Sequence, residues 1–313
     1  MGLFDGFLEL FLRLTDPTPE FSPERCLLER GAVGGCSACA EVCPKEAVDL
    51  SGQTVRIDEA ACTGCGLCAG ACPGIALEFP LAPVQEAFLR GRGVVRCSRA
   101  EGEGGEVYCL GRLTPGVLAW AASRLNELTL VHGQCASCQI GGEGVPKRVE
   151  EMIAEARRYY PETRATLTTE PPAKPVSLPR RELFKSLFST TRRLAAEALP
   201  DLPEEIAPPE ELEVPIELKL RRLAAERASE VRWPGVAVEE GCTLCPVCEN
   251  VCPTGAIRRE ARGEERALLL ELELCTGCSA CITSCPVGVM RPQDYGKEEL
   301  MASPLLLFSA PSS

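Results

Sequence analysis

Hydrophobic and polar positions between residues 84 and 160 predict alternating strands and helices. Short runs rich in β-branched residues alternate here with stretches of helical spacing. The strand candidates lie at 93–97, 106–111 and 128–133, and the helix candidates at 117–125 and 145–160. Thr114 followed by Pro115 is a typical helix start, with a capping hydroxyl before a proline in the first turn. The pattern predicts a small α/β domain over 84–160.

The first residues carry an amphipathic pattern. At residues 3–14, eight of twelve residues are large and apolar, and Asp5, Glu9 and Arg13 form a polar stripe with a spacing of four. We predict an N-terminal amphipathic helix within residues 1–22. It is too short to span a membrane, and its acidic residues make membrane attachment the least expected role. Packing on its own protein is the default expectation.

Residues 161–234 are interrupted by prolines and predict a linker with two helices. The helical patterns lie at 180–199 and 216–230, with an acidic, extended stretch between them. Five Lys or Arg residues in the first helix form a basic island in an acidic chain. A solvated helix face is the favoured interpretation of this island, and a docking surface is the alternative.

A short Cys-Pro unit is repeated four times and organises both ends of the chain. The copies begin at Cys43, Cys72, Cys252 and Cys285, and each follows a group of cysteines. Strand-like runs at 54–58 and 267–273 separate the members of each pair, and we expect them to pair with strands after the Cys-Pro turns. The predicted end domains are residues 23–83 and 235–292, followed by a tail at 293–313.

Composition and charge exclude several classes of function for this chain. Twenty of the 313 residues are cysteine, and no secretory signal pattern is visible, so we expect a cytoplasmic protein whose cysteines bind metal instead of forming disulfides. The net charge of −12 disfavours binding to nucleic acid or to anionic membranes. The sequence contains no phosphate-binding loop and no dinucleotide fingerprint, so no small-molecule substrate is evident.

The second pair of motifs has a regular cysteine spacing. Both members read C-x2-C-x2-C-x3-C-P, the first with Cys242, Cys245, Cys248 and Cys252, the second with Cys275, Cys278, Cys281 and Cys285. Zinc ribbons typically use two C-x2-C pairs instead. The spacing is that of bacterial two-cluster ferredoxins, in which the fourth cysteine of each run binds the other cluster. The ligand sets would be Cys242, Cys245, Cys248 and Cys285, then Cys275, Cys278, Cys281 and Cys252.

The first pair follows the same pattern with one departure. Its later member is complete, with Cys62, Cys65, Cys68 and Cys72. The earlier member has Cys36, Cys39 and Cys43, but its expected leading cysteine falls on Val33. Either Cys26 supplies the missing ligand, or that cluster is a 3Fe–4S form with an open corner. We favour Cys26, which otherwise has no role. The sets would then be Cys26, Cys36, Cys39 and Cys72, and Cys62, Cys65, Cys68 and Cys43.

The two end blocks resemble the bacterial 2×4Fe–4S ferredoxin family, and the whole chain resembles polyferredoxin-type proteins. The resemblance implies an α+β protein with four 4Fe–4S clusters, in which two ferredoxin-like domains flank the small α/β domain and are joined by helical linkers. It also implies relay of single electrons between other oxidoreductase subunits or redox proteins. The alternatives are a catalytic iron–sulfur subunit, with a dithiol or open-iron site fed by the clusters, and an oxygen-sensing regulatory protein.

Four cysteines remain in the central region: Cys97, Cys109, Cys135 and Cys138. They fall near the ends of the strand candidates, so their side chains could converge at one edge of a sheet. The layout is weakly similar to thioredoxin-like 2Fe–2S ferredoxins and to hydrogenase delta subunits. A 2Fe–2S cluster, a zinc ion and free or redox-active thiols are all considered. His132, the only histidine of the chain, lies three residues before Cys135, and a structural role is favoured over metal ligation.

Overall fold

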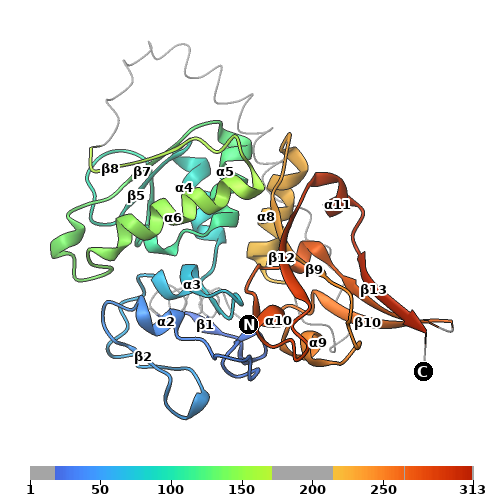
Figure 1. The fold of residues 1–313 in the computed structure, drawn as a ribbon. Coiled ribbons are helices and arrows are strands. Elements are labelled where there is room, and N and C mark those ends of the chain that lie inside the picture. The colour runs from blue at the N-terminus through green and yellow to red at the C-terminus, as the bar shows by residue number, and fades with distance from the viewer. Residues whose placement is uncertain (1–17, 171–213, 264, 312–313) are drawn as a thin grey trace, which may run out of the picture. The chain divides into compact units, whose positions relative to one another are not determined.

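A computed structural model of the chain describes residues 18–170, 214–263 and 265–311 (Figure 1). These residues all belong to one compact unit. The predicted helices at 3–14 and 180–199 lie outside the described residues. The described part contains two cysteine-rich segments and the polypeptide between them.

The N-terminal cysteine segment, residues 20–78, is built from very short elements. Its strands form two antiparallel pairs, in which β1 pairs with β4 and β2 with β3. The bounds are β1 (Glu20–Phe21), α2 (Ala38–Glu41), β2 (Val48–Asp49), β3 (Arg56–Ile57), α3 (Leu67–Ala71) and β4 (Leu77–Glu78), with 3-10 turns η1 (Pro23–Arg25) and η2 (Ser51–Gln53). The expected pairing of the run at 54–58 with a strand after the Cys-Pro turn is confirmed by β2 and β3.

The C-terminal cysteine segment, residues 233–311, repeats this plan with longer strands. The strand before its first motif, β9, pairs antiparallel with β12 after its last motif, and β10 and β11 form the hairpin between the motifs. The pairing expected for the run at 267–273 is therefore confirmed. The elements are β9 (Trp233–Val238), α9 (Val247–Val251), β10 (Ile257–Arg262), β11 (Glu265–Leu270), η5 (Leu272–Leu274), α10 (Ala280–Thr283) and β12 (Met290–Tyr295).

Residues expected to form a C-terminal tail extend the second segment. After β12 the chain forms α11 (Lys297–Met301) and then β13 (Leu305–Pro311). Strand β13 pairs antiparallel with β11, so the hairpin becomes a three-stranded sheet in the order β10-β11-β13. Leu268 and Leu270 of β11 are buried in the same core as Leu300 of α11.

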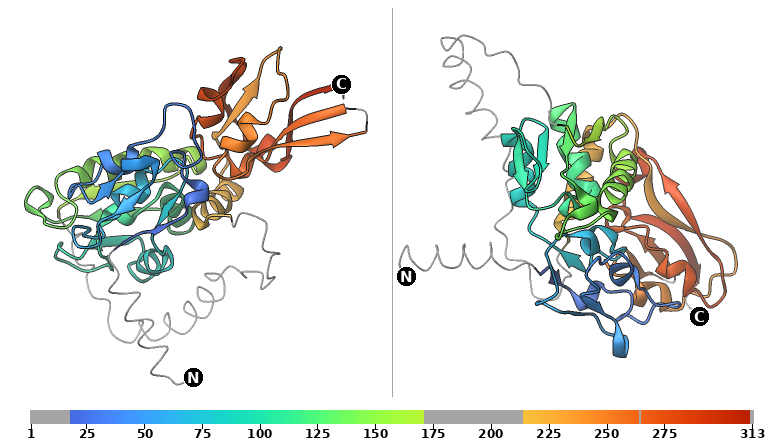
Figure 2. Two further views of the ribbon diagram at one scale, coloured as in Figure 1. Left: turned by 90° about the horizontal axis from the view of Figure 1, so that it is seen from below. Right: turned by 90° about the vertical axis from the view of Figure 1, so that its left-hand side faces the viewer.

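A four-stranded parallel sheet occupies the central region, with the order β6-β5-β7-β8. Figure 2 shows the chain from two further sides, with this region in cyan to yellow-green. Between two parallel strands, the chain must return to the end of the sheet at which the first strand began. Helices form most of these connections here. The elements of this central unit are α4 (Ala82–Arg90), β5 (Val94–Cys97), β6 (Gly105–Val107), η3 (Leu110–Arg112), α5 (Pro115–Leu125), β7 (Leu128–Val131), η4 (Cys135–Ser137), α6 (Gly144–Tyr159) and β8 (Ala165–Thr168).

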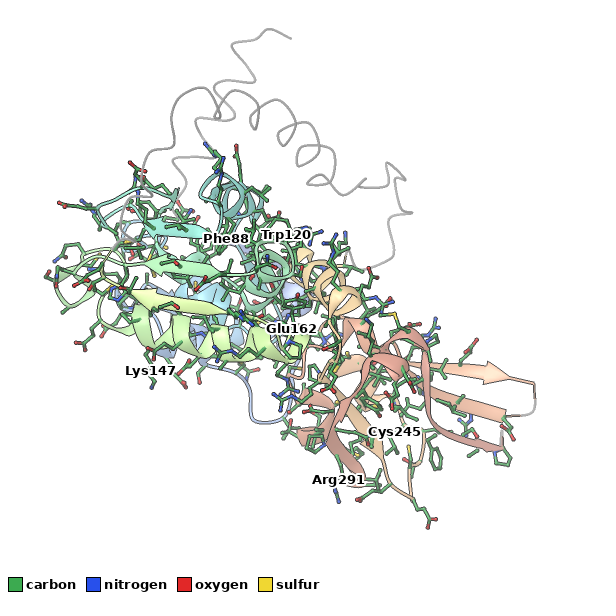
Figure 3. The ribbon with its side chains drawn as sticks, turned by 90° about the horizontal axis from the view of Figure 1, so that it is seen from above. Phe88, Trp120, Lys147, Glu162, Cys245 and Arg291 are labelled. Carbon is green, nitrogen blue, oxygen red and sulfur yellow. The ribbon has the colours of Figure 1, made fainter. Side chains whose placement is uncertain are left out.

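The central unit contains a large part of the apolar core. Phe88 of α4 and Trp120 of α5 are both fully buried and lie near the strands (Figure 3). The hydroxyl of Thr114 accepts a hydrogen bond from the N–H of Val117 at 3.3 Å, which confirms the predicted start of α5. Pro115 occupies the first turn of that helix, as expected.

Part of the stretch expected to be a linker is packed into this core. Strand β8 adds to the parallel sheet, and α8 (Ile216–Arg227) packs on α5. Glu217 of α8 accepts a hydrogen bond from the N–H of Gly116 at 2.7 Å and one from Arg221 Nε at 2.8 Å. Both side chains are buried. The apolar face of α8 is therefore covered by a partner helix that is distant in sequence.

Candidate functional site

The cysteines assigned to the first cluster line one cavity. Its lining includes Cys26, Cys36, Cys39 and Cys72, together with apolar side chains such as Phe21 and Val55. Cys26 follows the 3-10 turn η1, its N–H donates to the Pro23 carbonyl at 3.0 Å, and the residue is buried. Val33 lies outside this lining and is 63% exposed. Cys26, and not position 33, therefore borders the space that the other three cysteines surround.

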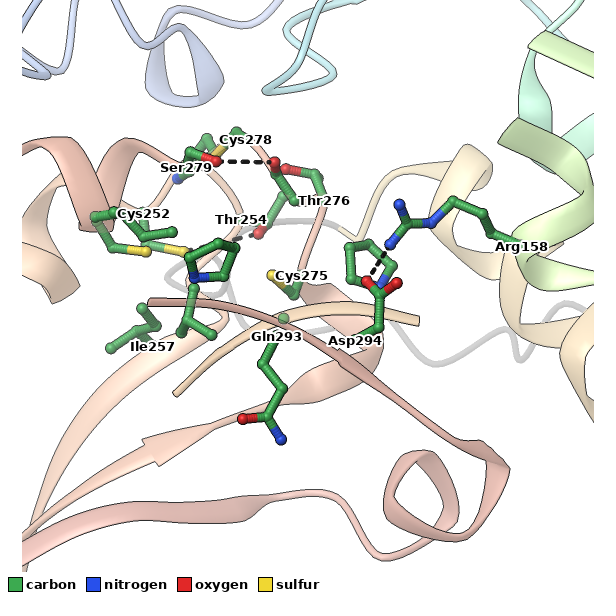
Figure 4. A pocket seen from close by; sticks show the side chains of 18 residues that line it. Arg158, Cys252, Thr254, Ile257, Cys275, Thr276, Cys278, Ser279, Gln293 and Asp294 are labelled. Carbon is green, nitrogen blue, oxygen red and sulfur yellow. Dashed lines mark hydrogen bonds and ion pairs between the residues drawn. The ribbon is translucent and has the colours of Figure 1, made fainter. Parts of the chain in front are cut away.

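Two further predicted sets each line a cavity of their own. Four cysteines of the N-terminal segment border one of these spaces: Cys43, Cys62, Cys65 and Cys68. Four of the C-terminal segment border the other, which Figure 4 shows from close by: Cys252, Cys275, Cys278 and Cys281. In both cavities three cysteines come from one motif and the fourth from the Cys-Pro turn of the other. This is the crossed arrangement that the spacing predicts.

The fourth predicted set is Cys242, Cys245, Cys248 and Cys285, and the pKa shifts of two of its thiols indicate their surroundings. Burial and the neighbouring thiols of Cys245 and Cys242 raise the pKa of the Cys248 thiol to about 11. Cys285, the fourth member, follows α10 on the opposite motif, and the N–H groups after it lower its pKa, although burial opposes this. Three cysteines of this set therefore interact directly, and Cys285 lies in a turn rich in N–H donors.

Backbone N–H groups point at several cysteine sulfurs. The donors are Ala47 to Cys43 at 3.3 Å, Ala76 to Cys72 at 3.2 Å and Leu244 to Cys242 at 3.4 Å. Such hydrogen bonds stabilise thiolate ligands and help to set the reduction potential of a cluster.

The Cys-x-x-Cys loops turn through left-handed backbone. Gly64 and Gly277 have φ of 66° and 75°, values at which glycine carries no steric cost. Gly277 is also in close contact, because a Cβ there would lie 2.9 Å from Cβ of Pro234. The corresponding position of a third loop is Leu244, with φ of 53°. These turns let successive cysteines face the same space.

Burial makes these thiols hard to ionise in the metal-free chain. Burial, followed by the neighbouring thiols of Cys72 and Cys36, raises the pKa of Cys39 to about 11. Burial also raises the pKa of Cys68 and of Cys275 to about 12. Thiols of this kind give up their protons when a cationic metal centre compensates the charge. The cavities are therefore suited to metal-bound thiolates and poorly suited to free thiolates.

Neighbouring sets lie close to one another. Helix α2, which carries Cys39, packs on α3, which carries Cys68. Helix α9, which carries Cys248, likewise packs on α10, which carries Cys281, so the two sets within each segment adjoin. A small apolar cluster joins the two segments through Leu27, Ala32, Val251 and Ala280, and Cys36 and Cys278 pack against it.

Hydrogen bonds reinforce the junction between the two cysteine segments. The N–H of Val33 donates to Ser284 Oγ at 3.0 Å, and Arg30 donates to the carbonyl of Asn250. At a third point, a Cβ on Gly74 would lie 3.3 Å from Cβ of Pro253. The set of Cys26, Cys36, Cys39 and Cys72 therefore adjoins the set of Cys252, Cys275, Cys278 and Cys281.

The four central cysteines line one cavity at an edge of the parallel sheet. Cys97 ends β5, Cys109 follows β6, and Cys135 and Cys138 follow β7. The carboxyl ends of parallel strands meet at one edge, which brings these segments together. His132 also lines the cavity, and its Nδ1 lies 3.5 Å from Cys135 Sγ and 2.8 Å from the Gly133 carbonyl.

None of the twenty cysteines forms a disulfide. Within residues 18–170, 214–263 and 265–311, no three His, Cys, Asp or Glu side chains come close enough to bind one metal ion. Cavities are lined by three of the predicted cube sets and by the four central cysteines.

Arg112 connects the central unit to the N-terminal segment, and the sequence analysis missed it. Its Nε donates to the Gly64 carbonyl at 2.8 Å, and its guanidinium lies over the rings of Phe79 and Tyr108, at 4.4 and 4.9 Å from their centroids. A Cβ on Gly66 would lie 2.7 Å from the Arg112 backbone. No local pattern identifies this residue, because its partners are distant in sequence.

A family model described as a 4Fe-4S dicluster domain matches the chain twice, at residues 33–76 and 241–289. No curated protein and no solved structure gave a match. Two segments of the chain are therefore similar to 4Fe-4S dicluster domains, and they flank the central unit. The first match begins downstream of Cys26 and does not include it. No helix among the described residues is long and apolar enough to cross a membrane.

Proposed function

We propose that this protein relays single electrons between oxidoreductase partners through four 4Fe–4S clusters. The supporting observation is that three of the four predicted ligand sets each border one cavity. The proposed ligand sets are Cys26, Cys36, Cys39 and Cys72; Cys43, Cys62, Cys65 and Cys68; Cys252, Cys275, Cys278 and Cys281; and Cys242, Cys245, Cys248 and Cys285.

The contacts between sets support a continuous route. Within each segment, thiols of the two sets interact through Cys39 and Cys68 and through Cys248 and Cys281. Between segments, Cys36 and Cys278 pack against the same small apolar cluster. The route therefore leads through the N-terminal pair, across this cluster, and into the C-terminal pair. Electrons move outer-sphere along it, so no substrate bond forms or breaks.

The charge of the chain supports protein partners with basic surfaces. The net charge is −12, and each oxidised cube with four thiolates adds a formal charge of about −2. An acidic protein attracts basic patches on its partners and speeds their encounter at low salt. We propose redox proteins or oxidoreductase subunits of that kind as donor and acceptor.

The test is anaerobic reconstitution of the full chain, followed by iron and sulfide analysis and a reductive titration. The four ligand sets predict about sixteen iron and sixteen sulfide per chain from the cubes, and an uptake of about four electrons. Reduced protein should then pass these electrons to a one-electron acceptor such as cytochrome c. About eight iron with half of the cysteines in disulfides, or clusters that accept no electrons, would refute the proposal.

A further inference from the structure

The central cavity lies where an α/β sheet typically binds a ligand. The strand order β6-β5-β7-β8 reverses at β5, because the chain moves from β5 to one side first and then to the other. Ligands of open parallel sheets bind outside the carboxyl ends of the strands at such a switch point. Cys97 at the end of β5 and Cys135 after β7 lie on the two sides of this point.

The cavity resembles those of the two predicted cube sites in the N-terminal segment. Its open space, including solvent at the mouth, is about 340 Å³, against about 340 Å³ for the cavity of Cys26 and about 380 Å³ for that of Cys65, whereas the cavity of Cys275 has about 670 Å³. Apolar side chains such as Leu110 and Val145 line it beside the four cysteines. The space is therefore comparable with that available to each cube in the N-terminal segment.

The central thiols have the same backbone hydrogen bonds as the predicted cube ligands. The N–H of Gly111 points at Cys109 Sγ at 3.5 Å, and the N–H of Ile140 points at Cys138 Sγ at 3.4 Å. Such N–H groups stabilise the thiolate ligands of an iron–sulfur cluster.

We propose that the central cavity binds a fifth iron–sulfur cluster, held by Cys97, Cys109, Cys135 and Cys138, which exchanges single electrons with the cluster bound by Cys65. The electron-transfer part rests on the proposed function, because it requires the cube of the Cys65 set. One electron leaves the reduced cube and reduces the central cluster by one, with no proton or bond transferred. The electron originates from the redox partner that reduces the cubes.

The contact between the two sites supports this exchange. A Cβ on Gly141 would lie 3.1 Å from Cys109 Sγ and 3.5 Å from Cys65 Cβ, so these two cysteines are separated by little more than one glycine. Thr63 donates to the Ile140 carbonyl at 2.7 Å, which ties the loop of the Cys65 set to the loop of Cys138. Cys65 also acts electrostatically on Cys109.

The test compares the reconstituted full-length protein with the double variant Cys135→Ser/Cys138→Ser. The matched control is Ser137→Ala, which alters an exposed residue between the two cysteines. The wild type and the control should bind about two to four iron more than the double variant, with equal extra sulfide. Equal iron in all three proteins, or one zinc per chain that the double variant lacks, would overturn the proposal.

Electron paramagnetic resonance of the fully reduced proteins tests the exchange. The wild type should show spin coupling between the central cluster and the neighbouring cube, and the double variant should lose this coupling while keeping the coupling between the two cubes of the N-terminal segment. Identical spectra would overturn electron exchange between the two sites. Protein that lacks the cubes altogether would instead refute the proposed function, since the double variant leaves all sixteen cube ligands in place.

A folding control keeps this test interpretable. Trp120 is buried in the core of the central unit, and its fluorescence reports whether that core is intact. If the double variant does not fold, the single variant Cys138→Ala replaces it, because Cys138 is only half-buried. This variant should lose the extra iron and sulfide as well, and full retention would overturn the assignment of Cys138.

Discussion

Replacing Cys26 by alanine gives the sharpest test of the first cluster. Cys26 borders the cavity together with three other cysteines, while Val33, which takes the motif position, is 63% exposed and lies outside the lining. Removing one of four thiolates leaves three ligands. A cube with three thiolates loses the iron at its open corner and keeps its sulfides.

The magnitude follows from this ligand count. Cys26→Ala should lower the iron content by about one per chain, from about sixteen in the four cubes to about fifteen, with sulfide unchanged. Val33→Ala is the matched control and should leave both values at the wild-type level. The other three sets contain no residue altered by either change, so their clusters report that the protein is intact.

The assay is iron and sulfide analysis with electron paramagnetic resonance of the oxidised protein. Cys26→Ala should give a three-iron signal that the wild type and Val33→Ala lack. A three-iron signal already present in the wild type and unchanged in Cys26→Ala would refute the assignment, because it would mean that the corner is open without any change. Loss of all four irons of this set would refute the three-ligand reasoning.

Three further predictions concern the packing around the clusters. Glu217→Gln removes the nearer of the two carboxylates that pair with the buried Arg221 guanidinium and leaves Glu155 at 3.5 Å, so chemical denaturation should show a loss of about 1–3 kcal/mol, and an unchanged midpoint would contradict this. Gly141→Ala, but not Gly144→Ala, should lower the iron bound in the central cavity, because only the first Cβ meets neighbours within 4 Å. Iron removal by a chelator should expose Trp233 of the C-terminal segment to solvent while Trp120 stays buried, as fluorescence of single-tryptophan variants can measure.

The local chemistry of the end segments could be predicted because it depends on short spacings. Three cysteines with two residues between each pair, followed by Cys-Pro, require a tight loop around a common space, and the family match agrees with that interpretation. The strand pairs between the motifs and the helix start at Thr114 were also predicted correctly, since pairing and capping involve residues near in sequence. Periodicity and turn residues carry that information directly.

Features that depend on distant partners could not be predicted. The helical pattern at 216–230 was visible in the sequence, but only the packing of α8 on α5 excludes water from Glu217 and from Arg221 one turn later. Arg112 carries no recognisable motif, because its role comes from contacts with Gly64 and Phe79 across a domain junction. The structural roles of such side chains depend on tertiary contacts.

The cysteines show the same difference between features set by local spacing and features set by tertiary contacts. The sequence by itself placed fifteen cysteines in four ferredoxin-type motifs and left Cys26 and the central four as candidates. The tertiary structure decided that Cys26 borders the first cavity and that the central four border one space beside Cys65. The physical reason is separation along the chain. Two cysteines with two residues between them lie in one short loop, whose geometry is local. Cysteines as far apart as Cys97 and Cys138, which are forty-one residues apart, border one cavity only because the parallel strands that precede them end side by side.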